Sequence, residues 1–119
     1  MTQLNGFVEK GWGFENIFAT NEKYTGKLLT FKEGAKFSMH FHTEKDETWF
    51  VLEGLFDLLT IDTKTADIKK ERMEPGTARR IMPPVPHQLI CIKAGTIIEV
   101  STADSVEDNH RVAKGDSQK

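Results

Sequence analysis

Apolar residues along this chain come in short runs that alternate with polar residues, and turn-forming residues separate the runs. Alternation of this kind predicts strands, because successive side chains of a strand point to opposite faces of the sheet. No window carries a 3.6-residue apolar period long enough to predict a major helix. We therefore expect eight strands, at residues 27–31, 37–42, 48–52, 56–61, 66–72, 78–82, 88–92 and 96–101.

The spacing of these strands predicts one all-β domain, in the form of a closed barrel or a sandwich. Turn-forming residues lie at 53–54, 74–76, 83–84 and 93–95, so we expect the chain to reverse at each of these points. A chain of 119 residues has room for a single core, which we assign to residues 1–112. Residues 113–119 contain little apolar material and predict a polar, flexible tail.

Composition and charge limit the classes of partner that such a domain could bind. The formal net charge is −2, which gives no electrostatic reason to bind nucleic acid or an anionic membrane. No apolar run approaches the ~20 residues of a membrane span, and the first residues lack the pattern of a signal peptide. Cys91 is the single cysteine and predicts a small buried side chain on a strand. One cysteine cannot form an intramolecular disulfide, so we expect a cytoplasmic protein.

Three of the four histidines belong to one constellation. His40 and His42 are two residues apart on a predicted strand, so both rings point to the same side. After a tight connection, the next strand can bring the carboxylate of Glu47 opposite them, and His87 can add a fourth ligand. Imidazoles and a carboxylate together suit one divalent ion of zinc, manganese, nickel or iron.

The same residues carry a resemblance to a known family. The stretch from Gly34 to Gly54 follows the pattern G-x5-H-x-H-x4-E-x6-G and resembles the first conserved motif of the cupin superfamily. The second cupin motif is partly present, since Gly76 and His87 have the right separation. Its other signature positions are filled differently, by Met82, Pro84 and Cys91.

Within the cupins, the chain resembles the type II mannose-6-phosphate isomerase-like group at residues 12–15, 45–49, 51–54 and 107–111. The resemblance spans residues 10–112 and implies a jelly-roll barrel, the double-stranded β-helix of cupins. It also implies a small-molecule substrate, a carbohydrate in this group, and a homodimer paired through its sheets.

A sugar isomerase needs contacts to the substrate and a general base besides its metal. Trp49 shares strand parity with Glu47, so its ring can serve either as a core aromatic or as a sugar platform. An anionic sugar phosphate would need a cation, and the candidates are Lys27, Arg79, Arg80 and Arg111. Arg79 is the better of the adjacent pair because it shares strand parity with Ile81, and Arg111 matches the arginine at the end of the resembling family's motif.

The sequence does not identify the base. Glu53 lies six residues from Glu47, about 20 Å along a strand. Glu99 and Asp104 are two further candidates that could approach the site, although acids in such positions are more often solvated at the surface. His110 is expected to be an exposed histidine outside the metal site.

Three functions fit these observations. The first is a metal-dependent, mannose-6-phosphate isomerase-like cupin that interconverts an aldose and a ketose through an enediolate. The second is an Fe(II)-dependent dioxygenase, because the same ligands also suit iron. The third is a metal-loaded barrel that binds a carbohydrate without turning it over.

Overall fold

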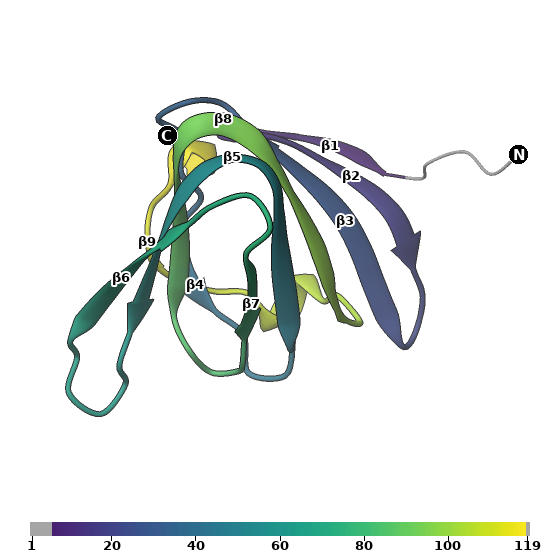
Figure 1. The fold of residues 1–119 in the computed structure, drawn as a ribbon. Coiled ribbons are helices and arrows are strands. Elements are labelled where there is room, and N and C mark those ends of the chain that lie inside the picture. The colour runs from purple at the N-terminus through teal and green to yellow at the C-terminus, as the bar shows by residue number, and fades with distance from the viewer. Residues whose placement is uncertain (1–5, 119) are drawn as a thin grey trace, which may run out of the picture.

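The computed structural model describes residues 6–118, and nearly all of its regular structure is β-strand (Figure 1). The predicted all-β architecture is confirmed, in the form of a sheet curled into a half-barrel. The strands are β1 (Phe7–Lys10), β2 (Gly13–Thr20), β3 (Tyr24–Phe31), β4 (Met39–Phe41), β5 (Glu47–Ile61), β6 (Ile68–Met73), β7 (Ala78–Ile81), β8 (His87–Thr102) and β9 (His110–Ala113). Two short 3-10 helices follow β8, η1 (Val106–Asp108) and η2 (Asp116–Gln118).

Two long strands, β5 and β8, form the backbone of the sheet. They pair antiparallel from Glu47 opposite Ser101 at one end to Thr60 opposite His87 at the other. Strand β3 pairs with the second half of β8, and β4 pairs with its first residue, His87. Strands β6 and β7 pair with the two halves of β5. Both halves of the curled sheet thus meet along one pair of strands.

The predicted turns at 53–54 and 93–95 are wrong, because both lie inside continuous strands. The pairing of β5 with β8 shifts register between Val51 and Phe56, which allows the two strands to bend together. Gly54 has a φ of +92°, and a Cβ there would lie 2.7 Å from the Cα of Gly95. A Cβ on Gly95 would in turn lie 2.1 Å from the carbonyl oxygen of Glu53. The two glycines let the strands cross closely where the sheet curls.

The inner face of the sheet changes from apolar to polar along each long strand. On β5, the side chains of Val51, Trp49 and Glu47 are buried on the inner face, while those of Phe50 and Leu52, which alternate with them, are exposed. Rows of paired residues across β5, β8 and β3 show the same order. The rows are Val51–Ile97–Leu29, Trp49–Glu99–Lys27 and Glu47–Ser101–Thr25. The apolar core and a polar site therefore lie next to each other on the same face of the sheet.

The apolar part of that face is closed by aromatic rings. Trp12 stacks on Phe31 with ring centroids 4.4 Å apart, and Phe37 packs against both of them. Cys91 is fully buried among these side chains, as expected.

The two ends of the chain differ from expectation. Strands β1, β2 and β9 were not predicted, and β1 and β2 extend the sheet beyond β3. Instead of forming a loose tail, the last described residues dock on the sheet: Asp116 accepts a hydrogen bond from the Lys36 backbone and Ser117 one from that of Gly11. Residues 1–5 of the predicted domain and Lys119 of the predicted tail lie outside the described residues. Among the described residues, no helix is long and apolar enough to cross a membrane.

Candidate metal centre

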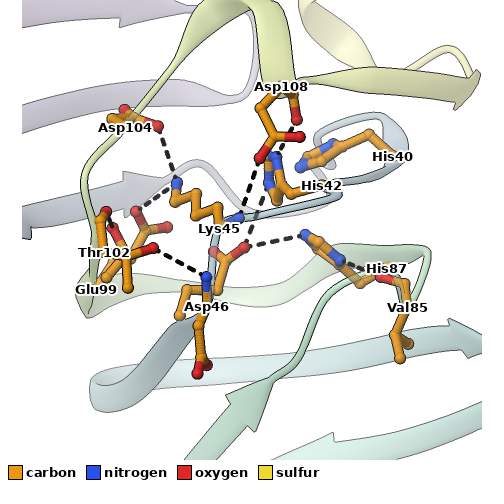
Figure 2. Close-up of polar contacts among 12 residues, drawn as sticks. His40, His42, Lys45, Asp46, Val85, His87, Glu99, Thr102, Asp104 and Asp108 are labelled. Carbon is orange, nitrogen blue, oxygen red and sulfur yellow. Dashed lines mark hydrogen bonds and ion pairs between the residues drawn. The ribbon is translucent and has the colours of Figure 1, made fainter.

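The structure brings three histidines together at the polar end of the inner face (Figure 2). His40 lies on β4 and pairs in register with His87, the first residue of β8, and His42 directly follows β4. One nitrogen of each ring lies within 4.8 Å of those of the other two. Residues 47 positions apart in the sequence are thus adjacent in the sheet, as the motif predicted.

Backbone carbonyl groups orient all three rings. The Nδ1 atoms of His40, His42 and His87 lie 2.9, 2.8 and 2.9 Å from the carbonyl oxygens of Ser38, Asp108 and Val85, respectively. Because a carbonyl oxygen only accepts hydrogen bonds, each Nδ1 carries the proton and each neutral ring keeps a lone pair on Nε2. This is the ring state in which imidazole binds a metal.

Glu47 completes the cluster. Its Oε2 atom lies 3.3 Å from Nε2 of His42 and 3.5 Å from Nε2 of His87. Among the described residues, Glu47 Oε2 and His87 Nε2 are the buried side-chain atoms that lack a hydrogen-bond partner. A buried polar atom without a partner costs about 1–3 kcal/mol. A cation between these atoms would satisfy both, so the donor set fits a divalent metal.

The environment keeps two of the rings neutral. Burial, together with the neighbouring histidines, lowers the pKa of His40 to about 2 and that of His87 to about 4. Burial alone would also lower the pKa of His42, but the contact with Glu47 outweighs it and raises that pKa. In the same contact, His42 offsets the effect of burial on Glu47 and holds the pKa of this carboxyl below its ordinary value.

A buried ion pair that the sequence did not indicate lies behind Glu47. Lys45 donates to Glu99 Oε2 at 3.2 Å and lies 3.2 Å from Asp104 Oδ1. The indole of Trp49 donates to the other oxygen of Glu99 at 3.1 Å. Burial, together with the nearby charge of Glu47, raises the pKa of Glu99.

Lys27 extends this network. Its Nζ atom lies 2.7 Å from Asp104 Oδ2 and 3.5 Å from Glu15 Oε1. Asp104 therefore bridges two buried lysines, one through each carboxylate oxygen. The expectation of a solvated surface acid is wrong for Glu99, which is buried in this network. Asp104 is exposed, as expected, although it also pairs with both lysines.

A cavity of about 520 Å³ opens beside the cluster and is lined by His40, His42 and Glu47. The segment after β8 supplies one wall through Asp104, Ser105, Asn109, Arg111, Ser117 and Gln118. Residues of the predicted tail thus contribute to the cavity.

The four predicted substrate contacts have different positions. Lys27, Trp49 and Arg111 line the cavity. Arg111 pairs in register with His40, and within the described part of the chain its guanidinium forms no ion pair. Arg79 lies on the same face as Trp49 but outside the cavity lining, because β7 is at the edge of the sheet and Arg79 pairs with Glu71 at 3.0 Å.

One aromatic residue near the histidines does not follow strand parity. Phe37 has the opposite parity to the histidines, yet its ring lies 5.0 Å from that of His40 and lines the cavity. The predicted strand 37–42 is regular only over Met39–Phe41, so parity does not hold at residue 37. His110 is exposed and stacks on Phe41, outside the histidine cluster.

Comparison with known proteins identifies the relatives of this chain. The family described as mannose-6-phosphate isomerase C-terminal matches residues 2–108. No curated protein matches the sequence.

Solved structures share the fold at low identity. Oxalate decarboxylase from Bacillus subtilis at pH 4.6 is 16% identical, with a TM-score of 0.77 over 90% of this chain and 30% of the enzyme. A further structure of the same enzyme concerns its Mn(II) centres, with 13% identity and a TM-score of 0.76 over the same shares. KdgF from a Halomonas species is 20% identical, with a TM-score of 0.71 over 87% of this chain and 90% of KdgF. The chain thus spans less than a third of the decarboxylase and nearly the length of KdgF.

Proposed function

Because the chain belongs to the cupins of the mannose-6-phosphate isomerase C-terminal family, we propose that it is a metal-dependent cupin acting on a sugar or sugar phosphate. The observation that carries this proposal is the convergence of three oriented imidazoles and an unpartnered carboxylate oxygen beside a cavity. The proposed reaction is the interconversion of an aldose and a ketose through an enediolate.

His40, His42, His87 and Glu47 are the proposed ligands of one zinc, manganese, nickel or iron ion. Four protein ligands leave one or two positions of a five- or six-coordinate ion for substrate oxygens. When bound, such an ion acts as a Lewis acid on the substrate carbonyl. The protein's own contribution is to fix neutral rings through backbone carbonyls and to bury the carboxylate.

Glu99 is the proposed general base, which the sequence alone did not identify. It lines the cavity, and its raised pKa makes its carboxylate a stronger base than an exposed glutamate. Lys45 and Trp49 hold one carboxylate oxygen each, which fixes the direction of the remaining lone pairs. In this scheme Glu99 takes the proton from the hydroxyl-bearing carbon and returns it to the neighbouring carbonyl carbon, while the hydroxyl proton passes to the carbonyl oxygen.

Arg111 is the proposed contact for an anionic group of the substrate, because it is exposed beside His40 without an ion-pair partner in the described part of the chain. Lys27 is less suited to this role, since two carboxylates already neutralise it. Trp49 is buried and acts through Glu99 in this proposal, while Arg79 has no part in it.

The proposal is tested by assaying metal-loaded protein for aldose–ketose isomerisation with phosphorylated and unphosphorylated sugars. We expect turnover that depends on the metal and falls about 10²- to 10⁴-fold in Glu99→Gln, while metal content stays unchanged. Metal-loaded protein that turns over no sugar but binds one in calorimetry would contradict the isomerase and favour the binding function. Dioxygen-dependent turnover of the iron form would favour the dioxygenase.

We further propose that two copies pair through the outer face of the sheet. A row of apolar residues crosses three neighbouring strands there, with Leu28, Ile98 and Phe50 in register. Leu52 and Val100 flank this row and are each about half exposed. An apolar patch on a sheet face favours association with another protein surface.

A further inference from the structure

Four residues, Thr43 to Asp46, connect two of the proposed metal ligands, His42 and Glu47. This connection lies between β4 and β5 and has no regular strand pairing. A connection of this kind does not hold its flanking ligands as firmly as a strand does. Something outside it must therefore fix the distance between His42 and Glu47.

Asp108, at the end of η1, binds most of this connection. Its Oδ1 atom accepts hydrogen bonds from the backbone N–H and the hydroxyl of Thr43, at 2.7 and 2.6 Å. Its Oδ2 atom accepts from the backbone N–H groups of Glu44 and Lys45, both at 3.0 Å. The backbone carbonyl of the same residue accepts the Nδ1–H of His42 at 2.8 Å.

The setting of Asp108 makes these contacts strong. The residue is buried, and Nε2 of His110 lies 3.7 Å from its Oδ1 atom. Burial would raise the pKa of Asp108, but the hydrogen bonds from Thr43, Glu44 and Lys45 reverse this and hold the pKa below its ordinary value. Hydrogen bonds to an ionised carboxylate are shorter and about twice as strong as neutral ones. Figure 2 shows Asp108 above His42 and the backbone of Lys45.

We propose that Asp108 is a positioning residue of the metal centre. The side chain and the backbone of Asp108 together hold His42 and Glu47 in a geometry that can bind a metal. The side chain fixes the connection, so that Glu47 arrives at a set distance from His42. The same hydrogen bonds fix the Asp108 carbonyl, which selects the tautomer and the direction of the His42 ring. This inference rests on the proposed function, because it assumes that His42 and Glu47 bind a metal.

One residue from the C-terminal segment would thus control two ligands of the first motif. Groups that orient metal ligands typically change metal affinity about 10- to 100-fold when they are removed. Asp108→Asn is a suitable change, because it keeps the size of the side chain and removes its charge and one of its acceptor atoms.

Asp46 provides a matched control in the same connection. It directly precedes Glu47 and carries a carboxylate, but that carboxylate pairs with exposed Arg80 on β7 and not with the backbone around the ligands. Asp46→Asn therefore removes one charge from the same segment without touching the orientation of His42.

The test is a titration of the full-length, metal-free protein with Co²⁺, followed by absorption spectroscopy and by calorimetric melting of the metal-free form. We expect Asp108→Asn to weaken Co²⁺ binding about 10- to 100-fold and to shift the visible Co²⁺ bands. Asp46→Asn should stay within about twofold of wild type, because surface ion pairs contribute little.

Two results would overturn the role of Asp108. In the first, Asp108→Asn lowers the melting temperature but keeps wild-type Co²⁺ affinity and bands, which would make Asp108 structural only. In the second, the wild-type protein takes up no Co²⁺, which would also remove the proposed function. The two failures are distinguishable, because the first leaves metal binding by the wild type intact.

If Asp108→Asn does not fold, Thr43→Val is used for the same titration. It deletes only the hydroxyl that donates to Asp108 and leaves the three backbone hydrogen bonds in place. We expect a weaker Co²⁺ affinity than in Asp46→Asn, and an affinity equal to wild type would overturn the proposal.

Discussion

Backbone carbonyl groups, rather than acidic side chains, orient the three histidine rings. Ser38, Val85 and Asp108 each supply one carbonyl, and the carbonyls of the first two lie two residues before the rings that they orient. The direction of His40 and His87 is therefore set by local backbone conformation. That of His42 depends on a segment 66 residues away in the sequence.

Asp104 has a measurable effect on stability through the two lysines that it bridges. Burial would raise its pKa, but Lys45 and Lys27 lower it from 3.8 to about 2 in the folded protein. A lowered pKa means that the folded state binds protons less readily, so this contribution is complete above about pH 4 and disappears as the pH falls to about 2. We predict that Asp104→Asn is less stable than wild type at pH 6.

The measurement is urea unfolding of the metal-free proteins from pH 6 down to pH 2. The difference in unfolding free energy between wild type and Asp104→Asn should shrink steadily below pH 4. A difference that stays constant over this range would contradict the bridging role of the ionised carboxylate.

Spacing predicted the cluster of His40, His42 and Glu47 but not the charges around it. These three residues are close in the sequence, so strand periodicity and one short connection bring them together. Lys45 looked like an ordinary turn residue, because its partner Glu99 is 54 residues away. For Glu99 a signal did exist, since it alternates inward with Ile97 and Ser101 on one strand. An acidic residue that alternates with inward-facing residues of a strand therefore indicates a functional site, although acidic residues in general are more often at the surface.

At the scale of elements, the bend shared by β5 and β8 is the feature that turns a flat sheet into a curled one. The sequence marks it with glycines that local propensity assigns to turns. A glycine turn in a hairpin and a glycine bend within a strand differ in the strand that pairs with the flanking residues. Here β5 and β8 pair with each other on both sides of the bend, and they are far apart in the sequence. The docked C-terminal segment was missed for a similar reason, because its hydrogen bonds go to Lys36 and Gly11.

Gly54→Ala tests the bend. Alanine would have to adopt a φ of +92° and place its Cβ 2.7 Å from a backbone atom of Gly95. We predict a loss of at least ~3 kcal/mol in unfolding free energy, from backbone strain and overpacking together. The measurement is urea denaturation followed by circular dichroism.

Gly34→Ala is the control for this change. Gly34 also has a positive φ, +79°, but no atom lies within 4 Å of a Cβ built there. Gly34→Ala should lower the unfolding free energy by only about 1–2 kcal/mol, because alanine is strained in this backbone conformation. Equal losses at the two sites would mean that the close approach to Gly95 does not matter.

At the scale of the whole molecule, the curled sheet has an inner face that carries the site and an outer face that carries the apolar row. Leu28, Ile98 and Phe50 point away from the cavity, so association through them leaves the site open. The proposed dimer would therefore form without obstructing the substrate.

Phe50→Glu tests this arrangement. A charge buried in an apolar interface is unfavourable, so we predict that wild type elutes as a dimer and Phe50→Glu as a monomer of 13.5 kDa. The measurement is size-exclusion chromatography with light scattering, and metal binding should be the same in both. Wild type that runs as a monomer would exclude the pairing.

The metal centre is the central claim, and elemental analysis tests it most directly. The protein is purified without an affinity tag, stripped with a chelator, reloaded with zinc, manganese, nickel or iron, and desalted. We predict about one divalent ion per chain in wild type and almost none in His40→Ala, which should still fold because His40 lines the cavity and is only partly buried. Wild type that takes up no ion, or His40→Ala with full occupancy, would contradict the account.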